Sequence, residues 1–175
     1  MTLHAITVLG HDRPGIIAEA TGRLADLGLN LEDSSMTLLR GHFAMTLVCA
    51  GPVSDADIET ALAPLAGDGR LTVTVREVPE ELTLDAEGPG STAWVLTVHG
   101  ADRPGIVSAI VAEVAAVGGN ITDLTTRLAG ELYLLIAELD LPAGADAGAL
   151  DAAIRAAAAS LGVDASLREA EADEL

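Results

Sequence analysis

Cysteine and aromatic residues are nearly absent from this chain of 175 residues. Cys49 is the only cysteine, which excludes a disulfide within the chain. Its apolar surroundings, from Phe43 to Ala50, predict a buried and unreactive thiol. The aromatic residues are Phe43, Trp94 and Tyr133, so the cores must be aliphatic and stacking on nucleobases has almost no side chains to use.

Positive charge is also scarce. The chain has nine basic residues, all of them arginine, against 27 acidic residues, and its formal net charge is −18. A surface of this sign repels phosphate backbones, so we expect no direct binding to nucleic acid or to an anionic membrane. The acidity by itself indicates only a well-solvated surface.

Long apolar runs and a targeting segment are missing as well. No uninterrupted apolar stretch is long enough to span a bilayer. The N-terminus lacks the basic and apolar segments of a signal peptide. We therefore expect a soluble, cytoplasmic protein.

The most informative feature that is present is a repeat. The segment GHDRPGI at residues 10–16 returns as GADRPGI at residues 100–106, an offset of 90 residues. Each copy follows a short apolar run and precedes a helix-like pattern, so each predicts a turn from a strand into a helix. Recurrence at one fixed offset indicates one structural unit that is used twice.

Hydrophobic periodicity predicts the same order in both copies: strand, helix, strand, strand, helix, strand. This order is the split βαβ, or ferredoxin-like, arrangement, an α+β fold with antiparallel sheets and helices on one face. We expect strands at residues 3–9, 29–39, 43–50, 71–76, 94–99, 132–141 and 163–168, and one that opens at residues 120–121 before a hairpin turn at Gly130.

The helix starts carry their own local patterns. Pro14 and Pro104 favour the first turn of a helix, where a missing N–H is tolerated. Asp12 is placed to cap that helix or to lie just ahead of it, and Ser54 is placed to cap the next one. Gly28 and the Gly118-Gly119 pair are expected to end the first helix of each copy.

An acidic stretch rich in glycine and proline separates the two copies. We therefore expect a first domain at residues 1–78, a linker at 79–92, a second domain at 93–168 and an acidic tail at 169–175. The strand at 132–141 is apolar on both faces. A sheet that is covered by helices on one face only would have a polar second face. We therefore expect the sister domain or a second chain to cover the second face of this sheet, or an edge.

The repeated motif, followed by Gly-Leu-Asn at residues 28–30 or Gly-Gly-Asn at 118–120, resembles the ACT domain. The resemblance covers residues 3–77 and 93–168. It implies two ferredoxin-like βαββαβ (ACT) domains in tandem, a class of modules that commonly bind amino acids and regulate enzymes or transcription. A stand-alone pair is similar to the glycine cleavage system transcriptional repressor group.

By this resemblance, ligands lie where the first turn meets the start of the second strand, often at an interface between two modules. Helix N-terminal N–H groups suit a carboxylate, glycine lets a ligand approach the backbone, and asparagine offers both a donor and an acceptor. The candidate residues are His11, Asp12, Arg13, Pro14, Gly15, Ile16 and Asn30 in the first copy and Ala101, Asp102, Arg103, Pro104, Gly105, Ile106 and Asn120 in the second.

A purely structural role for these residues stays open, since Asp, Pro, Gly and Asn also build turns. The exchange of His11 for Ala101 leaves open whether both copies bind. Asp55 and Asp57 follow a Gly-Pro break rather than a buried strand, so we interpret them as helix-capping residues and not as phosphatase residues.

No catalytic constellation is visible in the sequence. The four histidines lack metal-ligand spacing, and no P-loop is present, so we expect no cofactor and no enzyme. The resemblance to the ACT domain implies an amino-acid-sensing regulator that acts through a protein partner in transcriptional control of amino-acid (glycine) metabolism, as a homodimer or an intramolecular ACT pair. The alternatives are an interaction module with no ligand and an undetected enzyme.

Overall fold

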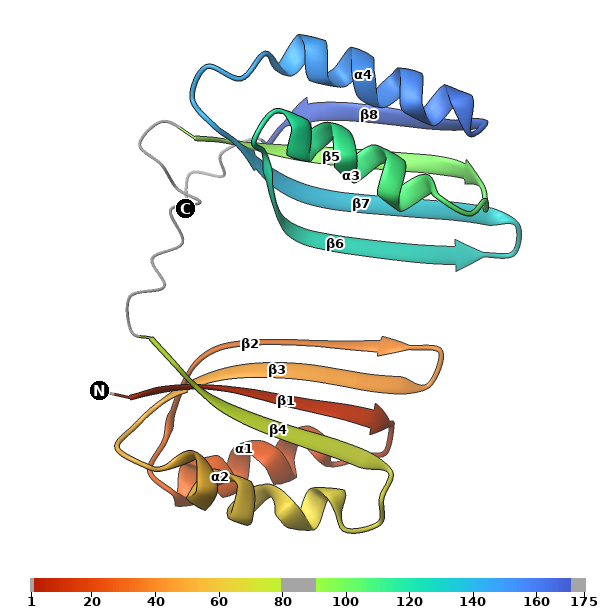
Figure 1. Cartoon of the computed structure of the whole chain (residues 1–175). Coiled ribbons are helices and arrows are strands. Elements are labelled where there is room, and N and C mark those ends of the chain that lie inside the picture. The colour runs from red at the N-terminus through yellow and green to blue at the C-terminus, as the bar shows by residue number, and fades with distance from the viewer. Residues whose placement is uncertain (1, 80–90, 171–175) are drawn as a thin grey trace. The chain divides into compact units, whose positions relative to one another are not determined.

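The computed structural model describes residues 2–79 and 91–170. The chain divides into two compact units, Met1–Leu82 and Thr83–Leu175 (Figure 1). Most of the predicted linker and of the predicted tail, residues 80–90 and 171–175, lies outside the described residues.

Each unit contains the predicted order of elements. The first consists of β1 (Leu3–His11), α1 (Ile16–Asp26), β2 (Asn30–Leu39), β3 (His42–Ala50), α2 (Asp55–Leu62), the short 3-10 helix η1 (Ala63–Ala66) and β4 (Leu71–Val78). The second consists of β5 (Thr92–Ala101), α3 (Ile106–Ala116), β6 (Asn120–Ala129), β7 (Leu132–Leu141), α4 (Ala147–Ser160) and β8 (Val163–Glu169).

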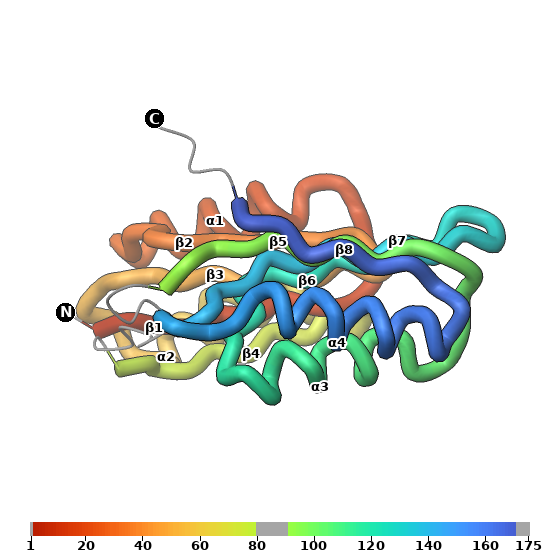
Figure 2. The backbone as a smooth tube through the Cα atoms, turned by 90° about the horizontal axis from the view of Figure 1, so that it is seen from above, coloured from red at the N-terminus to blue at the C-terminus, as the bar shows by residue number. Residues whose placement is uncertain are grey.

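Both units have the same topology. The strand orders are β2-β3-β1-β4 and β6-β7-β5-β8, and all neighbouring strands are antiparallel. In each unit the two helices cover one face of the sheet (Figure 1). Figure 2 shows α3 and α4 side by side along the strands of the second sheet. The predicted ferredoxin-like α+β fold is therefore confirmed.

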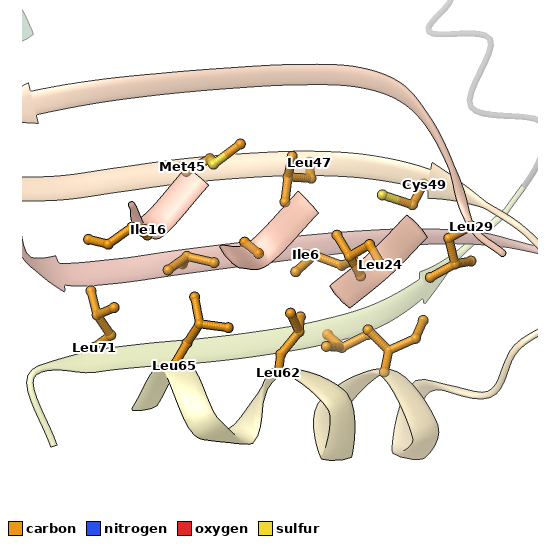
Figure 3. Close-up of a cluster of buried hydrophobic side chains, with 14 of the residues drawn as sticks. Ile6, Ile16, Leu24, Leu29, Met45, Leu47, Cys49, Leu62, Leu65 and Leu71 are labelled. Carbon is orange, nitrogen blue, oxygen red and sulfur yellow. The ribbon is translucent and has the colours of Figure 1, made fainter. Parts of the chain in front are cut away.

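Aliphatic side chains on the helix-covered face form the core of each unit. In the first unit, alternate residues of β1 and β3 meet the inner faces of α1 and α2, because successive residues of a strand point to opposite faces. Figure 3 shows this cluster, to which Ile6, Leu24, Leu47 and Leu62 contribute. Phe43 is the single aromatic residue among the fully buried core side chains of the described chain, whereas Trp94 and Tyr133 are only partly buried.

The opposite face of the second sheet stays open. Leu135, Ala137 and Leu139 of β7 are buried beneath the helices, whereas Leu132 and Ile136, which alternate with them, are 52% and 42% exposed. The two apolar faces that the sequence predicts for this strand are therefore present. Coverage by another module stays a prediction.

The helices start later than the prolines suggest. Gly15 and Gly105, with φ of 89° and 93°, are the N-cap residues of α1 and α3, so Pro14 and Pro104 lie in the preceding turn. The prediction that proline occupies the first helical turn was wrong. The left-handed conformation at the glycine separates the proline from the helix, and neither helix has a side-chain cap, so Asp12 does not cap α1.

Gly10 lies near the end of β1, where it pairs with Leu71 at the start of the antiparallel strand β4. Its φ is 155°, and a Cβ atom there would lie 2.0 Å from the carbonyl oxygen of Arg70. The His11 N–H also donates to that oxygen at 3.0 Å, so the backbones cannot separate without losing a hydrogen bond. Only glycine fits this position.

We predict that Gly10→Ala lowers the free energy of unfolding by at least about 2 kcal/mol, because the clash is with backbone. The matched control is Gly22→Ala in the middle of α1, where a Cβ meets nothing within 4 Å. This control should be neutral or stabilising by up to about 1 kcal/mol, since alanine favours helix more than glycine does. Urea denaturation of both variants measures the difference, and equal stabilities would contradict the assignment.

Candidate ligand-binding site

The first copy of the motif forms the connection from β1 to α1. The His11 N–H donates to the Arg70 carbonyl, and the Asp12 N–H donates to the Gly41 carbonyl at 3.2 Å. Gly41 belongs to the tight hairpin between β2 and β3, in which Arg40 and Gly41 both have positive φ. The motif is therefore anchored between this hairpin and the start of β4.

The helices that follow the motif differ from the other two helices at their N-termini. Ser54 Oγ accepts from the Asp57 N–H in α2, and Asp146 Oδ1 accepts from the Ala149 N–H in α4. Neither α1 nor α3 has such a cap. Because the first N–H groups of a helix lack partners inside the helix, α1 and α3 each offer free donors and a partial positive charge.

The glycine at each of these N-termini leaves space for a ligand. A Cβ atom at Gly15 would meet nothing within 4 Å, and one at Gly105 would meet only Ser108 Oγ, at 3.9 Å. A carboxylate can therefore approach the free N–H groups closely. Gly15 and Gly105 are required by their positive φ as well, so their presence alone does not separate ligand binding from turn building.

The remaining residues of the two motifs fall into two groups. Ile16 and Ile106 are 1% and 2% exposed and belong to the cores, so their side chains hold the helix on the sheet. Asp12, Pro14, Ala101, Asp102 and Pro104 are exposed. Among the described residues, neither Asp12 nor Asp102 makes a side-chain hydrogen bond.

The motif arginines differ between the units. Arg13 Nη2 donates to Glu19 Oε2 at 2.9 Å, and Glu19 Oε1 accepts from Arg23 Nη2 at 3.1 Å. Hydrogen bonds from Arg13 and then Arg23 hold the pKa of Glu19 below its usual range. Arg13 is therefore already paired with a carboxylate.

Arg103 has no such partner in the part of the chain that the structure describes. The position that corresponds to Glu19 is Ala109, which cannot form an ion pair. The guanidinium lies against the turn before β8, where a Cβ atom on Gly162 would be 3.5 Å from Arg103 Cζ. Arg103 is thus the motif arginine that is available to an anion.

The asparagines lie far from the motif within each unit. Asn30 pairs in register with Ala50, which pairs with Leu3 at the start of β1. The motif begins at the other end of β1, where His11 is in register with His42 and Leu39. Leu3 and His11 are eight residues apart, or about 26 Å in a strand.

The second unit repeats this separation. Asn120 is in register with Asp140 and Ala93, whereas Ala101 at the other end of β5 is in register with Leu132 and Ala129. The structure therefore brings the motif beside the hairpin and not beside the asparagine. One amino acid cannot contact both parts of the candidate set within a single unit.

The buried polar residues of the first unit have structural roles. Burial raises the pKa of the Cys49 thiol, which keeps it protonated, as the sequence predicts for an unreactive cysteine. His4 is fully buried, and its Nδ1 lies 2.7 Å from Asp55 Oδ1. Asp55 Oδ2 also accepts from the Glu77 N–H, so this carboxylate ties α2 to β1 and β4.

A cavity of about 500 Å³ lies elsewhere, along α1 and the start of β2. It is lined mainly by apolar side chains, among them Leu24, Leu31 and Cys49, and by no residue of the motif or asparagine set. Within residues 2–79 and 91–170, no three potential metal ligands are grouped together. No helix among the described residues is long and apolar enough to cross a membrane.

The sequence pattern of the ACT domain matches residues 3–76 and 92–168. The chain belongs to the ACT domain family. It is 28% identical over 169 residues to the glycine cleavage system transcriptional repressor of Escherichia coli. The alignment covers 93% of this chain and 87% of that protein. It is also 38% identical over 85 residues to a UPF0237 protein of Methanopyrus kandleri, covering 49% of this chain and 83% of that one.

Two solved structures share the fold over almost the whole chain. The crystal structure of an unknown protein from Galdieria sulphuraria matches with a TM-score of 0.78 at 27% identity, over 97% of this chain and 98% of that chain. A putative glycine cleavage system transcriptional repressor matches with a TM-score of 0.66 over 97% of both chains, and at 19% identity it shares the fold. The chain is thus a tandem ACT-domain protein related to this repressor group.

The carboxylate of Glu19 should make stability depend on pH. Its pKa is lowered on folding, so its contribution is present above the unfolded pKa and is lost as the pH falls through the folded pKa. We predict that Glu19→Gln is less stable than wild type near neutral pH and that the difference shrinks in acid. Glu59→Gln, at an exposed position of α2, is the control. Urea denaturation of these proteins from neutral pH into acid measures the trend. A difference in the free energy of unfolding between Glu19→Gln and wild type that stays constant with pH would contradict it.

Proposed function

We propose that the protein is a cytoplasmic regulator that senses an amino acid through its two motif turns and passes the response to a protein partner. The observation that supports this most concerns the N-termini of α1 and α3. Each begins with a glycine N-cap and has no side-chain cap, whereas α2 and α4 each have one. The carboxylate of an amino acid is the group that such an N-terminus accommodates.

The full ligand set requires two modules. Since each motif and its own asparagine are about 26 Å apart along the sheet, the asparagine must come from a different module than the motif. Both β2 and β6 are edge strands, and antiparallel pairing of two such edges sets the start of one strand against the end of the other. This pairing would carry an asparagine toward the motif end of its neighbour.

The apolar side chains of these edge strands support such pairing. Leu31, Met36 and Leu38 of β2 are 44%, 45% and 48% exposed, and Leu124 and Leu128 of β6 are 38% and 42% exposed. An exposed edge strand with apolar side chains is a template for pairing with another strand. The second module comes from a homodimer or from an intramolecular ACT pair.

The second motif is the stronger candidate for binding. Arg103 is available to an incoming carboxylate, whereas Arg13 is engaged by Glu19. We propose that an amino-acid carboxylate binds at the α3 N-terminus with Arg103 beside it. Gly105 supplies the positive φ that the turn requires, and the first copy binds more weakly or not at all.

The response is proposed to reach transcription through a protein partner. The formal charge of −18 disfavours direct contact with DNA, and the Escherichia coli relative is named as a transcriptional repressor of the glycine cleavage system. Glycine and related amino acids are therefore the first ligands to test. A ligand can shift the arrangement of modules only by binding one arrangement more tightly than another.

We predict that at least one of the twenty amino acids, tested at millimolar concentration, raises the melting temperature of the protein. Loss of the charge-assisted bond in Arg103→Gln should weaken binding about tenfold or more. Arg13→Gln is the matched control and should change binding less than threefold, on the order of 0.6 kcal/mol. Calorimetric titration of the three proteins measures this difference.

If no amino acid stabilises the protein, the chain is better explained as an interaction module without a ligand. That alternative predicts that Asn30→Ala and Asn120→Ala leave partner binding intact. Direct DNA binding in a gel shift at physiological salt would contradict the proposed route through a protein.

A further inference from the structure

Two histidines face each other at the end of the first sheet. His11 is the last residue of β1, His42 is the first residue of β3, and the two are directly opposite in register. Both side chains are exposed, and their ring centroids lie 5.4 Å apart with the planes tilted by 52°. In register they alternate with Val8 and Phe43 of the core, so they project from the face that the helices leave open.

This spacing matches that of two imidazoles on one metal ion. Metal–nitrogen bonds of about 2.0–2.1 Å in a tetrahedral arrangement place two bound imidazole centroids about 5 Å apart. The observed separation of the ring centroids, 5.4 Å, is close to this value. The backbone beneath it is held in place, because His11 and Asp12 donate their N–H groups to Arg70 and Gly41.

We propose that His11 and His42 form a binding site for one divalent transition-metal ion of the class that prefers imidazole, namely Zn²⁺, Cu²⁺ or Ni²⁺. Imidazole nitrogen is a favoured ligand of these ions. Because the described residues contain no group of three ligands, water or another small ligand completes the coordination. The net charge of the chain favours cations over anions at such a surface.

The site is specific to the first unit. The positions that correspond to His11 and His42 are Ala101 and Leu132, which pair in the same register of β5 and β7. The two units therefore differ in their side chains at this end of the sheet. The second has Arg103, which has no ion-pair partner among the described residues, and the first has a histidine pair. A bound ion would clamp the end of β1 to the start of β3 and so stiffen the first motif.

The test is calorimetric titration of the chelator-treated full chain with Zn²⁺, Ni²⁺ and Cu²⁺. We expect one ion per chain, with binding weakened at least about tenfold in His11→Ala and in His42→Ala. His99→Ala is the matched control, because His99 is exposed on β5 and has Leu134 and Asp164 as register partners. It should bind like wild type.

A second variant moves the histidine pair to the corresponding positions of the second unit. It keeps the test informative even if the single substitutions impair folding. Ala101→His with Leu132→His, placed in the His11→Ala/His42→Ala background, should restore one site in the second unit. Thermal denaturation with and without metal should show stabilisation in wild type and in this second variant only. Unchanged binding in His11→Ala would overturn the proposal and assign binding to other surface groups. An equal loss in His99→Ala would also overturn it, because the histidine pair would then not be the specific site.

Discussion

The register between β1, β3 and β2 is the constraint on which the rest of the first unit depends. It places the motif beside the β2–β3 hairpin and sends Asn30 to the far end of the sheet. It also sets His11 opposite His42. Since a slip by one residue would turn every side chain to the other face, burial of the core fixes all three relations at once.

The two units share one fold but differ in the side chains at the motif end of the sheet. In the first unit, the motif arginine is neutralised by Glu19, and a histidine pair occupies the sheet end. In the second, Ala109 replaces the carboxylate and leaves Arg103 without an ion-pair partner among the described residues.

Local pattern predicted the elements, the hairpins, the caps of α2 and the aliphatic cores, because each depends on residues close together in the chain. It failed at Pro14, where the left-handed Gly15 displaces the helix start. The resemblance to the ACT domain grouped Asn30 with the motif, and the sequence analysis did not pair His42 with His11. Both relations depend on the pairing of strands that are distant in sequence. Motif spacing carries no information on that register.

The central claim is that an amino acid binds across two modules, at the motif of one and the asparagine of the other. A crystal structure of the chain with the most stabilising amino acid tests it directly. The account predicts that the ligand carboxylate lies within hydrogen-bonding distance of the N–H groups at the start of α3, beside Arg103, and that its amino group contacts an asparagine from another module. A ligand held within a single module, for instance in the cavity between α1 and β2, would contradict it.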